Sequence, residues 1–143
     1  MQSARFAAQW NWQSQWRPLN GTKLVGYWDL SLAEWRGTRF RNTPGRHQYL
    51  TDLGITPVLR LSGETGTGSY FEAGVGAHLL SEKYNNNGHR FSTNFQFGTH
   101  VGVGYVFQNR LDLGINFRHL SNAGIMQPNS GQNFAGARIA YTF

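Results

Sequence analysis

The sequence contains no cysteine and no long apolar run. Without cysteine the chain cannot form a disulfide, use a thiol nucleophile or hold zinc through thiolates. No stretch approaches about 18 consecutive apolar residues, which excludes a transmembrane helix but not a membrane β-barrel, because barrel strands are apolar on one face only. No N-terminal segment combines a charged start, an apolar core and a small-residue cleavage site. If the protein is exported, its signal peptide is missing from this chain.

Acidic residues are also scarce, with 7 Asp and Glu against 13 Lys and Arg and a formal net charge of +6. A basic balance fits nucleic acid, an acidic membrane surface or phosphorylated ligands. Only 14% of the 143 residues are charged, whereas 18 are Gly and 15% are aromatic. A chain of this length holds one domain, residues 1–143, and its composition favours an all-β fold.

Apolar and polar residues alternate most clearly at 110–121, where Leu111, Leu113, Ile115 and Phe117 share one face. This period of two residues is that of a β-strand with two chemically opposite faces. The same pattern predicts strands at 4–16, 23–36, 48–61, 70–80, 91–107 and 132–143. Gln108 and Asn109 form a tight hairpin turn. Strands of roughly 10 to 16 residues are long enough to cross a bilayer at a tilt.

Alternation alone does not separate a soluble lipocalin-like barrel from an outer-membrane barrel. Three features favour the membrane. Aromatic residues such as Trp16 and Trp35 gather near strand ends, as in interfacial girdles. The chain ends in Phe143 on an alternating strand, which resembles the terminal signature of proteins inserted by the outer-membrane assembly machinery. Short and long connections also alternate, so we predict an antiparallel outer-membrane β-barrel with its long loops outside the cell.

The number of predicted strands is odd. With seven antiparallel strands the first and last run the same way, whereas single-chain bacterial barrels have even strand numbers. We therefore expect a barrel of the eight-strand type, with one strand before Ser3 absent from this chain.

His119 and Ser121 continue the apolar face of the strand at 110–121. Polar side chains are costly on a face exposed to lipid. Residues two apart on a strand are about 6.6 to 6.8 Å apart, so their side chains can lean into hydrogen-bond reach. The pair is interpreted either as base and nucleophile or as two polar residues at the membrane–water interface.

Residues 118–125 read Arg-His-Leu-Ser-Asn-Ala-Gly-Ile, and Gln127, Pro128, Asn129 and Gly131 follow. This segment resembles the signature of PagL-type lipid A 3-O-deacylases. Supporting matches lie at 10–12, 26–29 and 71–76. The resemblance spans nearly the whole chain, beginning at what would be the second strand of the family.

The resemblance implies a serine esterase that removes the ester-linked 3-hydroxyacyl chain at the 3 position of lipid A. Ser121 would be the nucleophile and His119 the general base. Strand order agrees: the C-terminal strand should end at the periplasmic side, which places His119 and Ser121 near the extracellular end. We thus expect a protein of the bacterial outer membrane whose active site faces the outer leaflet.

The third member of the family's triad is a Glu fourteen residues beyond the His, and Asn133 occupies that position here. Alternation back from Phe143 puts Asn133 on the same outward face as His119. An Asn oxygen can orient an imidazole but cannot stabilise an imidazolium by charge, so activity is expected to be weak or absent unless Asn133 presents its oxygen well. The alternative is a catalytically inactive barrel with a lipid-binding or structural role.

The loop at 122–131 offers Asn122, Gly124 and Asn129 as oxyanion or substrate-binding donors, although Asn, Gly and Pro also simply make turns. Basic residues cluster in two long loops, where they either contact lipopolysaccharide phosphates or form a solvated surface. They are Arg36, Arg39, Arg41, Arg46, Lys83 and Arg90.

The remaining predictions concern other ligands. His47, His78, His89 and His100 lack metal-ligand spacing, so neither a metal site nor a cofactor is predicted. The chain carries no nucleic-acid-binding signature. We expect a monomer or homodimer whose partner is lipid A or lipopolysaccharide.

Overall fold

The computed structural model describes residues 1–143 as a curled antiparallel β-sheet with a small added hairpin. No helix in it is long and apolar enough to span a membrane. The strands are β1 (Gln2–Trp16), β2 (Thr22–Gly37), β3 (Gln48–Gly63), β4 (Gly68–Leu80), β5 (Asn85–Asn86), β6 (His89–Arg90), β7 (Phe95–Val106), β8 (Leu111–Ser121) and β9 (Gln132–Tyr141).

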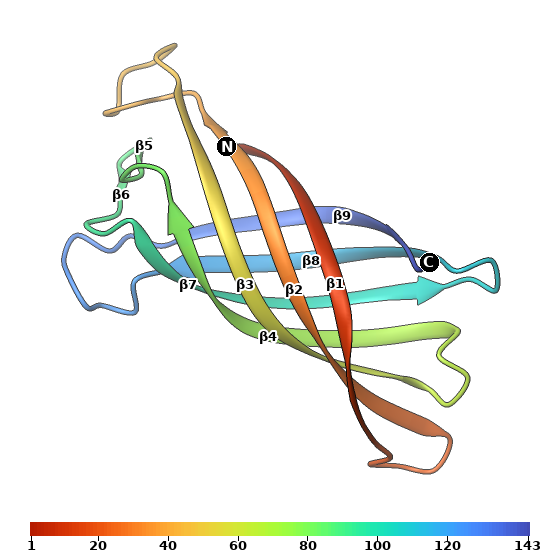
Figure 1. The fold of residues 1–143 in the computed structure, drawn as a ribbon. Helices are drawn as coiled ribbons and strands as arrows, with labels where there is room; N and C mark the ends of the chain where they lie inside the picture. Colours follow the sequence, from red (N-terminus) through yellow and green to blue (C-terminus); the bar gives the residue numbers. More distant parts are fainter.

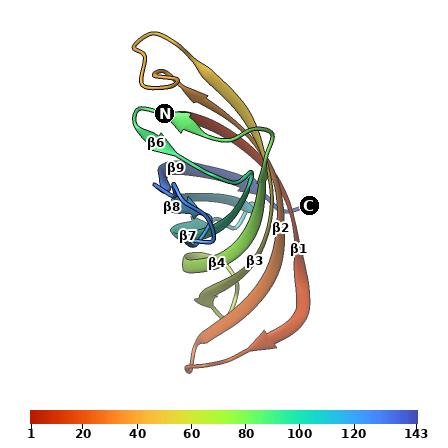
Figure 2. The ribbon, with the colours of Figure 1, turned by 90° about the vertical axis from the view of Figure 1, so that its left-hand side faces the viewer.

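The main sheet has seven strands in the order β1-β2-β3-β4-β7-β8-β9, and every neighbouring pair is antiparallel. The two edge strands, β1 and β9, run the same way and do not pair with each other. The sheet is therefore a half-barrel that is open between them (Figures 1 and 2). Figure 1 shows the long loops gathered at one end of the strands and the tight turns at the other.

The seven strands predicted from alternation are all present, and their bounds differ from the predicted ones by at most two residues except at the start of β7. The predicted strand at 91–107 begins at Phe95 instead. Phe91 is only 3% exposed because it packs into an interior cluster, whereas Phe95 is 41% exposed on the outer wall. The segment between them leaves the strand, and β5 and β6 form a hairpin within the predicted loop. Its turn residues Asn87 and Gly88 both have positive φ, as a two-residue I′ turn requires.

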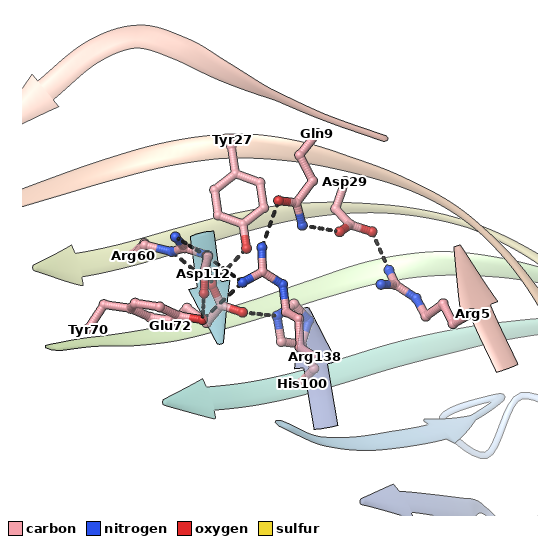
Figure 3. A network of polar contacts seen from close by, with 10 residues as sticks. All are labelled: Arg5, Gln9, Tyr27, Asp29, Arg60, Tyr70, Glu72, His100, Asp112 and Arg138. Carbon is pink, nitrogen blue, oxygen red and sulfur yellow. Dashed lines mark hydrogen bonds and ion pairs between the residues drawn. The ribbon is translucent and has the colours of Figure 1, made fainter. Parts of the chain in front are cut away.

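The two faces of the sheet differ as the alternation predicts. On β8, Leu113, Ile115 and Phe117 are exposed on the outer wall, and Asp112 is 4% exposed inside. The inner wall holds a network of charged and phenolic side chains (Figure 3). Buried charges require such partners, because an unpaired ion in a low-dielectric interior is strongly destabilising.

Arg60 is the centre of that network. Its guanidinium donates hydrogen bonds to Glu72 Oε2 at 2.7 Å and to Asp112 Oδ2 at 3.0 Å. Arg138 donates to the same Asp112 oxygen at 2.6 Å, and the Tyr27 hydroxyl donates to Glu72 at 2.8 Å. These bonds connect strands from across the sheet and hold its curvature.

An apolar cluster fills the interior at the end that carries the long loops. It contains Ala33, Trp35, Leu50, Leu80, Tyr84, Phe91 and Leu120, with Phe134 packed against it. The rings of Trp35 and Phe134 lie 4.6 Å apart between centroids. Burial raises the pKa of Tyr84 to about 12, so its phenol stays neutral in this cluster. Leu120 and Phe134 anchor the loop ends of β8 and β9 from inside.

Candidate active site

His119 and Ser121 lie on the outer wall at the loop end of β8, on either side of the buried Leu120. Leu120 is 1% exposed and belongs to the interior cluster, so it fixes which way this part of the strand faces. Because side chains alternate across a strand, His119 and Ser121 must point outward. The apolar core thus determines the direction of both candidate catalytic side chains.

Asn133 lies directly opposite His119 in the pairing of β8 with β9. Its Oδ1 is 2.7 Å from His119 Nδ1, a hydrogen-bond distance. An Asn side chain is one methylene shorter than Glu, and at this register it still reaches the imidazole. On the other side of His119, β7 places Thr99, a polar residue in an otherwise apolar outward series that the sequence analysis did not single out.

The hydrogen bond with Asn133 determines which imidazole nitrogen could act as a base. When Oδ1 accepts from Nδ1–H, Nε2 keeps its lone pair and can take a proton. The reversed amide would donate Nδ2–H to Nδ1 and leave the proton on Nε2, where the ring cannot act as a base. A carboxylate accepts only, so it permits the first arrangement alone. The amide is therefore the weaker orienting group.

Gly131 forms a wall against the His119 ring. It is buried and has a φ of 65°, and an added Cβ there would lie 2.7 Å from His119 Cε1. Real Cβ atoms do not approach that closely, so a side chain at 131 would displace the imidazole. No role for Gly131 was predicted from the sequence, in which its place two residues before Asn133 was the available signal.

Ser121 does not hydrogen-bond His119 in the structure. Its Oγ accepts instead from the backbone N–H of Ala123 at 3.5 Å. Catalytic hydrogen bonds are often long or misaligned without substrate. A rotation of the Ser121 side chain about χ1 is the movement that would bring Oγ toward the imidazole.

The three candidate oxyanion donors differ in how far they are engaged. Asn122 is fully buried, and its Nδ2 donates to Ser92 Oγ at 2.9 Å and to the Met126 carbonyl at 2.8 Å. The Gly124 N–H donates to Asn122 Oδ1 at 3.0 Å. Asn129 Oδ1 accepts from the Asn122 backbone N–H at 3.0 Å, while its Nδ2 has no hydrogen-bond partner. The Asn129 amide nitrogen is the donor left free.

Five of the six basic residues lie in or beside the long loops, and the sixth, Arg36, lies on a strand. Arg39, Arg41, Arg46, Lys83 and Arg90 are exposed in or beside the loops that the sequence analysis identified. Arg36 differs, because it lies on the outward face of β2. There its guanidinium donates to His47 Nε2 at 3.1 Å and lies 6.0 Å from the centre of the Tyr49 ring. None of these six cations forms a salt bridge.

The fold resembles a solved outer-membrane protein. The crystal structure of the outer membrane enzyme PagL matches with a TM-score of 0.79 and 25% sequence identity, over 96% of this chain and 86% of that chain. The fold therefore defines this chain as one of the antiparallel outer-membrane β-barrels, with seven strands in the half-barrel described above.

The family follows from the sequence comparisons. The family model for lipid A 3-O-deacylase (PagL) matches residues 2–142. The lipid A deacylase PagL of Pseudomonas aeruginosa is 29% identical over 129 residues, covering 89% of this chain and 70% of that protein. The Bordetella bronchiseptica lipid A deacylase PagL is 37% identical over 79 residues, covering 55% of this chain and 44% of that protein. This chain belongs to the PagL family of lipid A 3-O-deacylases.

Proposed function

We propose that this chain hydrolyses the ester that links a 3-hydroxyacyl chain to the 3 position of lipid A, with Ser121, His119 and Asn133 as its catalytic residues. The observation that supports this most strongly is the 2.7 Å contact between His119 Nδ1 and Asn133 Oδ1. It lies on the outer wall beside Ser121, in a chain that belongs to a family of lipid A deacylases.

In the first half of the reaction, Ser121 Oγ turns toward His119, and Nε2 takes its proton as Oγ attacks the ester carbonyl carbon. The carbonyl oxygen becomes an oxyanion, for which the free Asn129 Nδ2 is the donor. His119 then returns the proton to the sugar oxygen as the carbon–oxygen bond breaks. The acyl chain remains on Ser121.

In the second half, His119 takes a proton from water, and the resulting hydroxide attacks the acyl-enzyme. As the second tetrahedral intermediate collapses, His119 returns that proton to Ser121 Oγ, which releases the 3-hydroxy fatty acid and restores the serine hydroxyl. The imidazolium forms once in each half-reaction, and Asn133 opposes it with a dipole and not with a charge. A carboxylate-to-amide change in a Ser-His-Asp protease costs about 10⁴ in kcat, so we expect slow turnover.

The placement of the site supports the outer leaflet as its location. β8 and β9 have an apolar outer surface below the site, at Phe117 and Ala135, and a polar one at His119 and Asn133. A lipid ester at the rim of the hydrocarbon would meet Ser121 there. The loop cations, with Arg36 on the wall of β2, lie at the same end and suit the phosphates of lipopolysaccharide.

One observation favours a second function, that of a catalytically inactive barrel with a lipid-binding or structural role. It is the absence of a carboxylate beside His119, where Asn133 stands. The two functions make different demands on Ser121, because only an enzyme needs its hydroxyl.

The test is the release of free 3-hydroxy fatty acid from lipid A in detergent micelles by the purified, refolded protein. We expect slow release by the native chain and none by Ser121→Ala. Equal release by the two proteins, or none by either at any enzyme concentration, would favour the inactive barrel.

A further inference from the structure

Ser92 is a polar residue of the segment between β6 and β7, outside the catalytic strands and the loop at 122–131. Its Oγ accepts a hydrogen bond from Asn122 Nδ2 at 2.9 Å and donates one to the Met126 carbonyl at 2.8 Å. Asn122 Nδ2 also donates to that Met126 carbonyl at 2.8 Å. The three groups therefore close a triangle, and one of its members directly follows Ser121 in the sequence.

The orientation of the Asn122 amide is unambiguous. Its nitrogen faces the Met126 carbonyl, which can only accept, and its oxygen faces the Gly124 N–H, which can only donate. With no exposed surface, Asn122 has no competing water. A buried amide with both hydrogens and its oxygen engaged is rigid, because each lost bond would leave an unsatisfied polar group.

The backbone of Asn122 in turn orients Asn129. Its N–H donates to Asn129 Oδ1 at 3.0 Å, so the oxygen must occupy that side of the Asn129 amide. Nδ2 is then directed away from Asn122 and has no partner. A displacement of Asn122 would move the Ser121 backbone and the Asn129 nitrogen together.

We infer that Ser92 is a positioning residue for the deacylation reaction: by fixing Asn122, it holds the Asn129 amide nitrogen where the oxyanion forms. This inference rests on the proposed function. Ser92 touches neither substrate nor reacting atoms, and its effect passes through Asn122.

The contact between Ser92 and Asn122 is not needed merely to hold the two loops together. The same segments are already joined by a reciprocal pair, in which the Arg90 N–H donates to Ser130 Oγ at 3.1 Å and the Ser130 N–H donates to the Arg90 carbonyl at 3.2 Å. A backbone bridge between Phe91 and Asn129 adds a further connection. Ser92 is the residue of this segment that reaches the Asn122 side chain.

The test compares Ser92→Ala with two matched serine variants. Ser130→Ala removes a hydroxyl from the other connection between the loops and does not touch Asn122. Ser81→Ala removes one that bonds to β3 through the Thr51 N–H. Each protein is refolded, its folded fraction is measured by heat-modifiable migration, and kcat and KM are determined on lipid A micelles. The parent protein and every variant in the series are also prepared with Asn133→Asp to raise the signal.

We expect Ser92→Ala to lower kcat about 10- to 100-fold with little change in KM, since a displacement of about 1 Å can cost a factor of about 100. Ser92→Thr, which keeps the hydroxyl, should restore most of the rate. Ser130→Ala and Ser81→Ala should stay within about twofold of the parent protein. Labelling of Ser121 by a long-chain alkyl fluorophosphonate should slow in Ser92→Ala alone.

Three results would overturn the inference: an unchanged kcat in Ser92→Ala, an equal loss in Ser130→Ala, or a loss confined to KM. Failure of the proposed function looks different, because the parent protein and its Ser121→Ala variant would then release the same amount of fatty acid. The two failures are therefore distinguishable in one series.

Discussion

Two histidines of this chain have a hydrogen-bond partner at nearly the same distance, one on each wall of the sheet. On the inner wall, His78 Nδ1 lies 2.8 Å from Asp52 Oδ1, and the two residues are 5% and 1% exposed. On the outer wall, His119 Nδ1 lies 2.7 Å from Asn133 Oδ1. The buried pair includes a carboxylate, as a catalytic triad does, whereas the outer pair lies beside a serine, Ser121.

The inner histidine has no space for a reacting molecule. An added Cβ would lie 2.4 Å from His78 Nε2 at Gly98 and 2.5 Å from its Cε1 at Gly54, so the ring is clamped between two backbones. The nitrogen that would act as a base is covered. The direction in which a strand presents its side chain therefore sets what each histidine can do. Asp52 can only stabilise the fold through His78, whereas the pair of His119 and Asn133 faces outward, where we propose that it takes part in a reaction.

The largest expected effect is on fatty-acid release, which should depend on the outer histidine and not on the inner one. Ser121→Ala and His119→Gln should each lower fatty-acid release to background, and the double variant should lower it no further, because the two act as one unit. His78→Gln should keep the parent kcat in its folded fraction. A His78→Gln protein that folds but has lost its activity would contradict this assignment.

The next largest effect is expected when the partner of the outer histidine, Asn133, is replaced. Asn133→Asp keeps the shape of the side chain and adds a charge, and Asn133→Glu adds a methylene as well. Both should raise kcat, by up to about 10⁴ given the cost of the reverse change in a protease. Adding Ser121→Ala should abolish the gain. If the native protein deacylates rapidly and both carboxylates slow it, the amide is the evolved orienting group.

A charge on the outer wall should destabilise the protein more than a charge in a loop. Ile115 is 65% exposed on β8. Ile115→Arg should lower the free energy of unfolding by about 2 to 4 kcal/mol if the residue lies near the bilayer midplane. Ile125 is equally exposed in the loop at 122–131, and Ile125→Arg is the control, with little expected change. Urea titration in lipid vesicles measures both. Equal costs would place β8 outside the membrane.

The smallest effect is expected from a substitution that makes the inner pair resemble the outer pair. Asp52→Asn should lower the free energy of unfolding by about 1 to 3 kcal/mol, because it weakens a buried hydrogen bond to a charged group. The same titration measures the loss, and kcat per folded molecule should not change. A fall in kcat without a loss of stability would give Asp52 a part in the reaction.

The fold could be predicted because it follows from alternation, and the outer pair could be predicted because the resemblance to the PagL family implies the position and alternation gives its facing. A period of two residues predicts the seven strands, and the same parity, counted back from Phe143, puts Asn133 on the face of His119. Sequence distance and phase agree on Asn133, since the neighbouring Gln132 has the opposite phase.

The loop contacts could not be predicted from the sequence because loop residues follow no regular period. Phe91 continues the alternation of β7 in the sequence, but its side chain is buried in the apolar cluster, where its ring centroid lies 5.2 Å from that of Tyr84. Ser92 is polar and lies next to it, and nothing in its sequence context indicates a bond to Asn122. Contacts between loops depend on how the strands curve, which local patterns do not encode.

The most direct test of the central claim is mass spectrometry of lipid A from outer membranes that contain the native protein, Ser121→Ala or no copy of the chain. The account predicts a fraction of lipid A lighter by one 3-hydroxyacyl chain with the native protein, and a larger fraction with Asn133→Asp. Ser121→Ala should leave the mass unchanged. An unchanged mass with correctly folded native and Asn133→Asp proteins would contradict the account.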